Sequence, residues 1–342
     1  MALIDVSGLS IQLQTHRGPA RAVRDISFHI ERGQALGLIG ESGCGKSITA
    51  MALMGLLPDS ARVSGSAHFD GNSLVNLPDS WWRTVRGNRI GMIFQEPMTA
   101  LNPVHTIGQQ ISEPLRLHKN MSVRQAKTEA IALLNRVGIA QPEQRYDAYP
   151  HQFSGGQRQR ITIAMALACG PDLLIADEPT TALDVTIQQQ ILDLINELVA
   201  ERNMALLLIS HDLGVISQNV DQMVVMYGGT VVESGMTDAV FAQRAHPYTR
   251  GLFAARPQLN ATNADAPLPT IAGTVPELVD LPTGCPFAGR CSYTQENCYT
   301  ERPQPRMLKA PSLAAPASLA SWRQPHLVRC LHEQALNAEA TA

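Results

Sequence analysis

The chain has 342 residues, which is longer than one average domain and suggests a main domain with an appendage. Hydrophobic residues make up 44% of it and charged residues 17%, which is typical of globular proteins and excludes a disordered or mainly membrane-embedded chain. With 27 Lys and Arg against 30 Asp and Glu, the formal net charge is −3, so no overall positive field favours a nucleic acid as partner.

The first residues, MALIDVSGLS, lack the basic segment and the continuous apolar run of a secretory signal. The sequence also lacks a run of roughly 18 apolar residues, which a membrane-spanning helix requires. We therefore expect a cytoplasmic chain that needs other proteins for any task inside a membrane.

Short apolar runs between glycine or proline residues predict buried strands. In chain order these are residues 26–30, 35–39, 173–176, 205–209 and 223–227. Helical segments separate them, which predicts a largely parallel α/β sheet. In the helix predicted at 185–200, with Asp184 as its N-cap, one face holds Ile187, Ile191, Leu194, Ile195 and Leu198.

The pattern between about residues 97 and 168 is helical with little strand signal, which predicts a helical insertion into the sheet domain. The composition changes near Ala255, since the last 86 residues hold 11 of the 22 prolines. We therefore predict a first domain at residues 1–255, and a linker with a small proline- and cysteine-rich domain at residues 256–342. Residues 257–269 have the polar, proline-rich content of a linker.

A phosphate-binding pattern, G-x-x-x-x-G-K-[ST], follows the predicted strand 35–39 and precedes a helical run at 48–57. Its glycines let backbone N–H groups face phosphate oxygens, and the positive end of the following helix adds to this. Lys46 is placed to contact the β- and γ-phosphates of a nucleotide, and Ser47 to ligate Mg²⁺. A chance glycine-rich turn is the alternative. The loop comprises Gly40, Glu41, Ser42, Gly43, Cys44, Gly45, Lys46 and Ser47.

The predicted strand at 173–176 leads into two carboxylates, Asp177 and Glu178. Both acids should emerge where the ends of parallel strands form ligand crevices. Asp177 is suited to hold Mg²⁺ through its hydration shell, and Glu178 to polarise the water that attacks the γ-phosphate. An apolar strand that ends in Asp-Glu is common in proteins. Its interpretation as part of a nucleotide site is supported by the phosphate loop in the same chain.

The segment FSGGQRQR at 153–160 resembles the LSGGQ signature of the ABC ATPases, with Phe in place of the first Leu. Ser154, Gly155, Gly156 and Gln157 begin a helical run, and its free N–H groups suit a γ-phosphate. The resemblance implies the ABC ATPase fold, a RecA-like P-loop NTPase core with a helical insertion. It also implies that this turn contacts ATP held by another subunit, so that turnover requires a dimer.

Three further segments resemble elements of the same family and follow in the family's order. Gln95 resembles the Q-loop, residues 181–184 the D-loop, and residues 210–212 the switch-histidine loop. Singly, Gln95 and His211 are more simply explained as structural residues. The resemblance implies that Gln95 senses the γ-phosphate and Mg²⁺, that His211 steadies the γ-phosphate, and that Asp184 couples two sites across a dimer.

One departure from the family concerns the aromatic residue that stacks on adenine, because residues 9–24 contain no Phe, Tyr or Trp. His16 and Arg17 offer flat side chains in this stretch, whereas Phe28 fits the core of the predicted strand 26–30. The residue that contacts the base is left open by the sequence.

Four cysteines near the C-terminus, Cys285, Cys291, Cys298 and Cys330, are separated by 5, 6 and 31 residues. In a cytoplasmic chain such a group favours metal or cluster ligation over disulfides. The spacing lacks the paired C-x₂-C of common zinc sites, and four thiolates suffice for an iron–sulfur cluster. Zinc and free thiols remain alternatives.

The cysteine region resembles the C-terminal part of bacterial oligopeptide/dipeptide importer ATPases, together with the preceding segment HPYTR at 246–250. In that family the four cysteines hold a [4Fe–4S] cluster. The resemblance implies an ATPase that powers the import of di- or oligopeptides from the cytoplasmic face of the inner membrane. Nickel, glutathione or opines are alternative substrates within this branch.

The same resemblance implies the partners. These are two integral membrane permease subunits, a second related ATPase in a heterodimer rather than a homodimer, and indirectly an extracytoplasmic substrate-binding protein. A soluble ABC ATPase that serves ribosomes or DNA repair is a further alternative. It is disfavoured because the sequence shows neither a second ATPase domain nor a long coiled-coil or zinc insertion.

Overall fold

The computed structural model describes residues 2–256 apart from residue 182, together with residues 269–308 and 325–332. The predicted linker at 257–269 lies outside the described residues except for its last position. Within the described residues, no helix has both the length and the apolar character needed to cross a bilayer.

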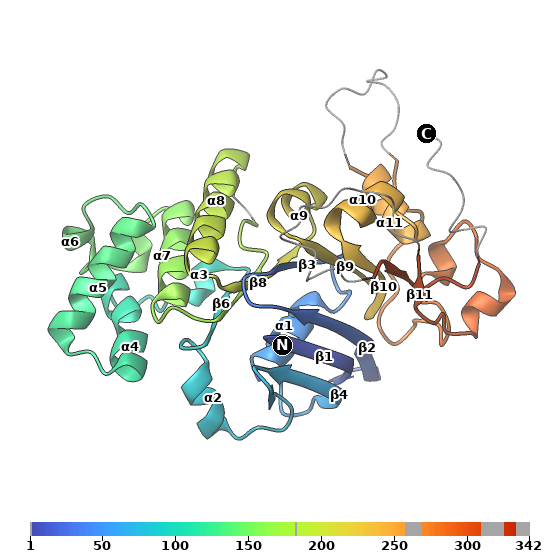
Figure 1. Ribbon diagram of the computed structural model, residues 1–342, viewed down its shortest axis with the longest axis horizontal. Helices are drawn as coiled ribbons and strands as arrows, with labels where there is room; N and C mark the ends of the chain where they lie inside the picture. Colours follow the sequence, from blue (N-terminus) through green and yellow to red (C-terminus); the bar gives the residue numbers. More distant parts are fainter. Residues whose placement is uncertain (1, 182, 257–268, 309–324, 333–342) are drawn as a thin grey trace, which may run out of the picture.

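An eight-stranded sheet forms the centre of the molecule, in the order β11-β12-β10-β9-β3-β8-β7-β6 (Figure 1). The neighbouring strands from β9 to β6 run parallel, which confirms the predicted parallel α/β sheet. The strands predicted at 35–39, 173–176, 205–209 and 223–227 agree with β3, β7, β8 and β9 to within one residue at each end, whereas β6 was not predicted. The parallel strands are β3 (Ala35–Ile39), β6 (Ile90–Ile93), β7 (Leu173–Asp177), β8 (Ala205–Ser210) and β9 (Gln222–Tyr227), and β10 (Thr230–Met236) pairs antiparallel with β9.

Successive residues of these strands enter two different cores. In β7, Leu173 and Ile175 pack in one core, and Leu174 and Ala176 pack in the other. A strand buried on both faces needs apolar residues at every position rather than at every second one. This is the reason that the sequence shows these strands as continuous apolar runs.

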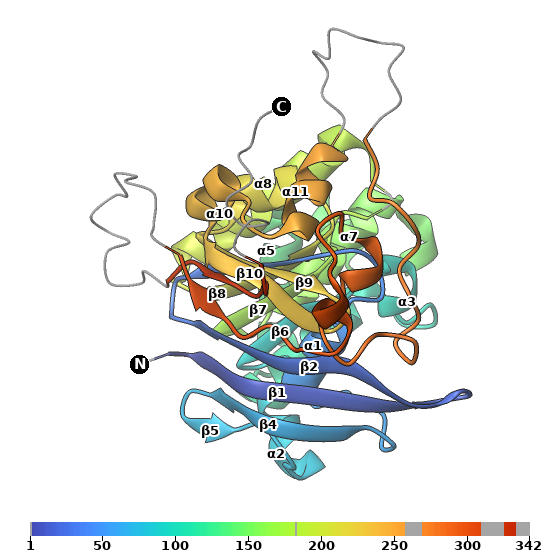
Figure 2. The same ribbon diagram turned by 90° about the vertical axis from the view of Figure 1, so that its right-hand side faces the viewer.

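A second, antiparallel sheet packs below the first in the order β2-β1-β4-β5, with α1 between the two sheets (Figure 2). This sheet was not predicted from the sequence, apart from the end of β2, where Phe28 is buried as expected. In β1, apolar residues alternate with polar ones, but the alternation shifts after Gly8, where the pairing register is irregular. The strands are β1 (Ile4–Thr15), β2 (Gly18–Ile30), β4 (Arg62–Phe69) and β5 (Asn72–Ser73).

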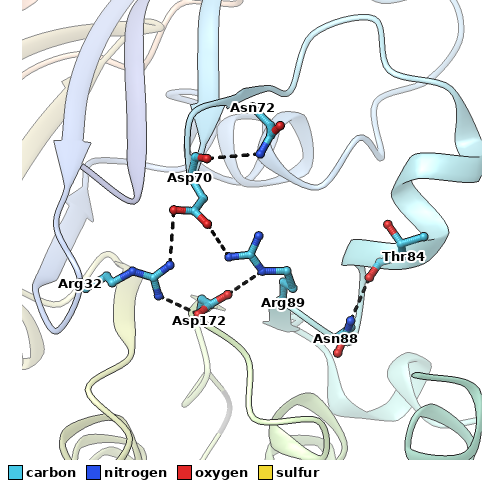
Figure 3. A network of polar contacts seen from close by, with 7 residues as sticks. All are labelled: Arg32, Asp70, Asn72, Thr84, Asn88, Arg89 and Asp172. Carbon is cyan, nitrogen blue, oxygen red and sulfur yellow. Dashed lines mark hydrogen bonds and ion pairs between the residues drawn. The ribbon is translucent and has the colours of Figure 1, made fainter. Parts of the chain in front are cut away.

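Four charged side chains join the two sheets (Figure 3). Arg32 lies 2.7 Å from Asp172 and 3.4 Å from Asp70, and Arg89 lies 2.7 Å from each of the same carboxylates. Arg32 and Asp70 follow strands of the antiparallel sheet, whereas Arg89 and Asp172 precede strands of the parallel one. Because the side chains are partly exposed, each pair stabilises the fold by only about 1 kcal/mol or less.

The predicted helical insertion is confirmed as a helical lobe at one end of the main sheet (Figure 1). Two of its long helices, α4 and α5, begin with capping boxes at Thr106 and Ser122, in which side chain and backbone satisfy each other's hydrogen bonds. The lobe consists of α3 (Pro97–Ala100), α4 (Ile107–Lys119), α5 (Val123–Arg136), α6 (Pro142–Arg145) and α7 (Gly155–Leu167).

Helices also cover the upper face of the main sheet in Figure 1. The helix α8 begins at the predicted N-cap, since the Asp184 side chain accepts a hydrogen bond from the Ile187 N–H at 3.0 Å. The helix predicted at 48–57 is shorter than expected, because its last residue is Leu53 and Gly55 takes a φ of 61°. The remaining helices are α1 (Lys46–Leu53), α2 (Asp79–Val85), α8 (Val185–Glu201), α9 (Leu213–Asn219), α10 (Thr237–Gln243) and α11 (Pro247–Ala254).

The described C-terminal residues extend the main sheet, since β12 (Leu327–Val328) pairs with β10 and β11 (Arg306–Met307) pairs with β12. The Glu233 carboxylate on β10 is fully buried, and it accepts hydrogen bonds from the N–H groups of Ala245 and His246, both at 2.9 Å. His326 Nε2 lies 2.8 Å from the same carboxylate. A buried carboxylate is tolerated only when it is bonded in this way, so the C-terminal residues complete a site inside the main sheet. The division of the chain at Ala255 stays a prediction.

Candidate active site

The predicted phosphate loop connects β3 to α1 at the carboxyl end of the parallel strands. Gly43 and Gly45 take φ values of 80° and 101°, which L side chains rarely adopt. A Cβ atom on Gly45 would also lie 2.6 Å from the carbonyl oxygen of Ala22. No side chain caps the first turn of α1, so its N–H groups are left for an anion.

Lys46 is almost fully buried at the start of α1. Its Nζ donates hydrogen bonds to the carbonyl oxygens of Gly40 at 2.7 Å and Glu41 at 3.2 Å. The ammonium group is therefore held inside the loop by the carbonyl groups of the loop's first two residues. This arrangement suits the phosphates of a nucleotide.

Asp177 ends β7 and is 5% exposed. Burial raises the pKa of its carboxyl group, while a hydrogen bond with the Ser47 side chain and the charge of Lys46 act against that rise. Its Oδ1 atom is buried and makes no hydrogen bond within the described residues. Two hard oxygen ligands beside a phosphate loop fit a Mg²⁺ ion that is shared with phosphates.

The side chain of the next residue, Glu178, is contacted by residues from three different parts of the chain. Its Oε2 atom lies 3.0 Å from Gln95 Nε2, 3.0 Å from Thr181 Oγ1 and 3.2 Å from His211 Nδ1. The backbone of Glu178 takes a φ of 47°, which is uncommon for a residue with a side chain and frequent at functional sites. The structure thus brings the predicted Gln95, Glu178 and His211 together, and it adds Thr181, whose contact the sequence did not reveal.

The signature turn lies on another part of the fold. Ser154 caps α7, because its Oγ accepts from the Gln157 N–H at 3.3 Å and its own N–H donates to the Gln157 side chain at 3.0 Å. Gly156 faces Ile187 near the start of α8, close to the Asp184 cap. Figure 1 shows α7 on the side of the helical lobe, away from α1 and the phosphate loop.

Two contacts of the phosphate loop with residues far along the chain were not predicted from the sequence. Arg290 donates to the Glu41 carboxylate through Nη1 at 2.6 Å and Nη2 at 3.3 Å. The N–H of Glu41 donates to the hydroxyl of Tyr248 at 2.8 Å. No sequence signal could have found the Arg290 contact, because its partners are separated by 249 positions.

The four C-terminal cysteines line one small cavity together with His332. Burial raises the pKa of the Cys285 thiol to about 12, and it raises the pKa of Cys291 and Cys330 as well. Thiolates here would therefore need a cation for compensation. Within the described part of the chain, no three or more Cys, His, Asp or Glu side chains are arranged closely enough to form a metal site.

A phosphate loop beside a strand that ends in Asp-Glu defines a P-loop nucleoside triphosphatase, and the comparisons with known proteins identify its family. The ABC transporter family matches residues 23–181, and the family described as "Oligopeptide/dipeptide transporter, C-terminal region" matches residues 232–298. This chain therefore belongs to the ABC transporter ATPases, in the branch that carries the oligopeptide/dipeptide C-terminal region. The predicted fold and family are confirmed.

Individual relatives agree with this assignment. The oligopeptide transport ATP-binding protein OppD of Salmonella typhimurium is 48% identical over 301 residues, which cover 88% of this chain and 89% of that protein. The dipeptide transport ATP-binding protein DppD of Bacillus subtilis is 50% identical over 291 residues, or 84% and 86% of the two chains. A bacterial ABC transporter cassette solved as a dimer superimposes with a TM-score of 0.62 at 25% identity, over 68% of this chain and 98% of that one.

Proposed function

We propose that this chain hydrolyses ATP to power the import of di- or oligopeptides through separate membrane subunits. The convergence of Gln95, Thr181 and His211 on one carboxylate oxygen of Glu178, beside the phosphate loop, carries the hydrolytic part. The peptide substrate is supported by the C-terminal match and by relatives whose names specify oligopeptide or dipeptide transport.

For hydrolysis, the phosphate loop and Lys46 hold the triphosphate and neutralise its charge. Ser47 and Asp177 would hold Mg²⁺, with Gln95 nearby, and the ion supplies electrostatic stabilisation of the β- and γ-phosphates when bound. Glu178 accepts a proton from the attacking water, and its orientation is maintained by hydrogen bonds from Gln95 and Thr181 and by the neighbouring His211. His211 is 63% exposed at its side chain, so it can turn toward the γ-phosphate when a nucleotide is present.

The separation of the signature turn from the phosphate loop supports a dimer. Ser154, Gly155, Gly156 and Gln157 of one subunit would contact the γ-phosphate that the other subunit holds, and Asp184 would lie at the contact between the subunits. Binding of ATP then favours a closed dimer, and loss of the γ-phosphate releases it. A related but distinct ATPase is the proposed second subunit, and the solved bacterial cassette offers a dimeric precedent.

In this proposal the chain lies peripherally at the cytoplasmic face of the inner membrane. Its partners in this proposal are two permease subunits and, indirectly, an extracytoplasmic binding protein. Nickel, glutathione or opines are the alternative substrates, since the transported molecule is selected by the other subunits.

We expect a tagged form of this chain, purified gently from native membranes, to retain two multi-span proteins and a related ATPase, as identified by mass spectrometry. An unrelated ATPase of another fold, purified in parallel, controls for non-specific capture. Recovery of ribosomal or DNA-repair proteins without a membrane partner would contradict the importer function and leave the ATPase chemistry untouched.

We further propose that Cys285, Cys291, Cys298 and Cys330 hold a [4Fe–4S] cluster. Their common cavity and their number of thiols support it, and so does the need of buried thiolates for a cation. The cluster would act as a structural cross-link that stabilises a region with little helix or strand of its own.

Anaerobically purified protein should contain about four iron and four acid-labile sulfide per chain. Cys298→Ser should lose most of both, whereas Cys169→Ser, which changes a cysteine outside the cavity, should retain them. Purified protein that contains zinc, and neither iron nor sulfide, would reject the cluster and support the zinc alternative.

A further inference from the structure

A cavity of about 440 Å³ opens directly beside the phosphate loop. Its walls come from three distant parts of the chain: Thr15, His16 and Ala20 of the β1–β2 hairpin, Ser42 and Gly43 of the phosphate loop, and residues 275–279 of the C-terminal region. Its size is that of a small-molecule site. Since two phosphate-loop residues line it, a ligand in this cavity can be continuous with a triphosphate in the loop.

The segment 275–279 is tied to the nucleotide site at its far end by Arg17, which follows His16 in the hairpin. Arg17 Nη1 donates to Glu277 Oε2 at 2.7 Å and to Asp280 Oδ2 at 2.8 Å, and its Nη2 donates to Asp280 Oδ1 at 2.8 Å. The pairing with Asp280 is bidentate, which fixes direction as well as distance. The hydrogen bond with Arg17 also lowers the pKa of the Asp280 carboxyl group below its ordinary value.

The near end of the segment is tied by Arg290. Its Nε donates to the Ala272 carbonyl at 2.9 Å and its Nη2 to the Ile271 carbonyl at 3.3 Å, while Nη1 bonds Glu41 of the phosphate loop. The stretch from Ile271 to Asp280 is therefore held at one end by Arg290, which contacts the phosphate loop, and at the other by Arg17, which follows the cavity residue His16.

The chemistry of the walls suits a purine ring. The C-terminal wall presents half-buried aliphatic groups of Val275, Pro276, Leu278 and Val279, and the imidazole of His16 lies on the hairpin wall. The Arg17 guanidinium is held by two carboxylates, so His16 is left as the flat side chain of the hairpin in this cavity. Flat heterocycles gain affinity from apolar surfaces and from ring faces.

We propose that residues 275–279 and His16 form the two walls of the adenine site, so that the C-terminal region supplies the base contact that an aromatic residue would otherwise make. This inference rests on the proposed ATPase function. It assigns Arg17 as a positioning residue, which acts through Glu277 and Asp280 and does not touch the base. It also gives the C-terminal region a part in nucleotide binding, besides the proposed cluster.

The test compares the affinities of the full-length chain for ATP and for inorganic triphosphate, which lacks the base and the ribose. Leu278→Ala removes half-buried aliphatic surface, and it should weaken ATP binding roughly 5- to 10-fold. Arg17→Ala frees the segment and should act in the same direction. Both variants should bind inorganic triphosphate with the same affinity as the wild type. The control is Arg21→Ala, which changes an exposed arginine of the same hairpin and should alter the affinity for neither ligand.

Unchanged ATP affinity in both Leu278→Ala and Arg17→Ala would overturn the inference. Equal weakening for ATP and inorganic triphosphate would overturn it as well, because the segment would then act on the phosphate loop. Thermal melting of each variant identifies loss of the fold. If the wild-type chain binds no ATP at all, the proposed function fails, which is a different result.

Discussion

Replacing Glu178 with glutamine is expected to lower steady-state ATP hydrolysis by about 100- to 1,000-fold while ATP binding is retained. Glutamine has the shape of glutamate and can accept hydrogen bonds from Gln95 and Thr181 through its amide oxygen, so the local packing should persist. An amide, however, does not accept a proton from water at neutral pH, and the attacking nucleophile is then not activated. Phosphate release under saturating ATP measures the first effect, and equilibrium ATP binding measures the second.

Glu143→Gln provides the matched control, because it makes the same chemical change on α6 in the helical lobe. It should leave both hydrolysis and binding at the wild-type level. Undiminished turnover in Glu178→Gln would show that Glu178 is not the general base, and His211 would then be the next candidate for that role.

Replacing Lys46 with alanine is expected to weaken ATP binding itself, by about 10- to 100-fold. The substitution removes a buried ammonium group that the Gly40 and Glu41 carbonyls hold across the loop. A charge-assisted hydrogen bond of this kind contributes about 1.5–3 kcal/mol, which corresponds to that range of affinity. Hydrolysis should fall as a consequence, even when ATP is raised to occupy the site, since the charge also stabilises the transition state.

Lys119→Ala is the control for this experiment, since Lys119 is an exposed residue at the end of α4. It removes the same charge from the chain and should leave ATP affinity unchanged. Normal ATP affinity in Lys46→Ala would contradict the assignment of residues 40–47 as the phosphate loop. Glu178→Gln and Lys46→Ala thus separate the chemical step from binding.

The sequence alone predicted those features that arise from local chemistry. Buried parallel strands such as β7 and β8 require apolar residues on both faces, so they are visible as continuous runs. The phosphate loop requires glycine where φ is positive, as at Gly43 and Gly45, and this leaves a fixed pattern of residues. The cap at Asp184 acts within three residues, so its effect is also local.

Other features were determined only by the tertiary structure. The antiparallel sheet was missed because the irregular register of β1 shifts its alternation of apolar and polar residues. Gln95, Thr181 and His211 meet at Glu178 because the loops that carry them lie beside one another at one edge of the sheet. Periodicity within a segment contains no information about such neighbours.

The cavity wall formed by residues 275–279 is the clearest example of a feature that only the tertiary structure determined. Arg17 and Asp280 are 263 positions apart, and Arg290 and Glu41 are 249 positions apart. Neither pair belongs to a recognisable motif, because an arginine and a carboxylate so far apart in the sequence have no visible relation until the fold places them together. The sequence by itself therefore determined which chemistry this chain carries, through short motifs whose geometry is local. Only the tertiary structure determined that the C-terminal region lies against the nucleotide site, because long-range packing sets that contact.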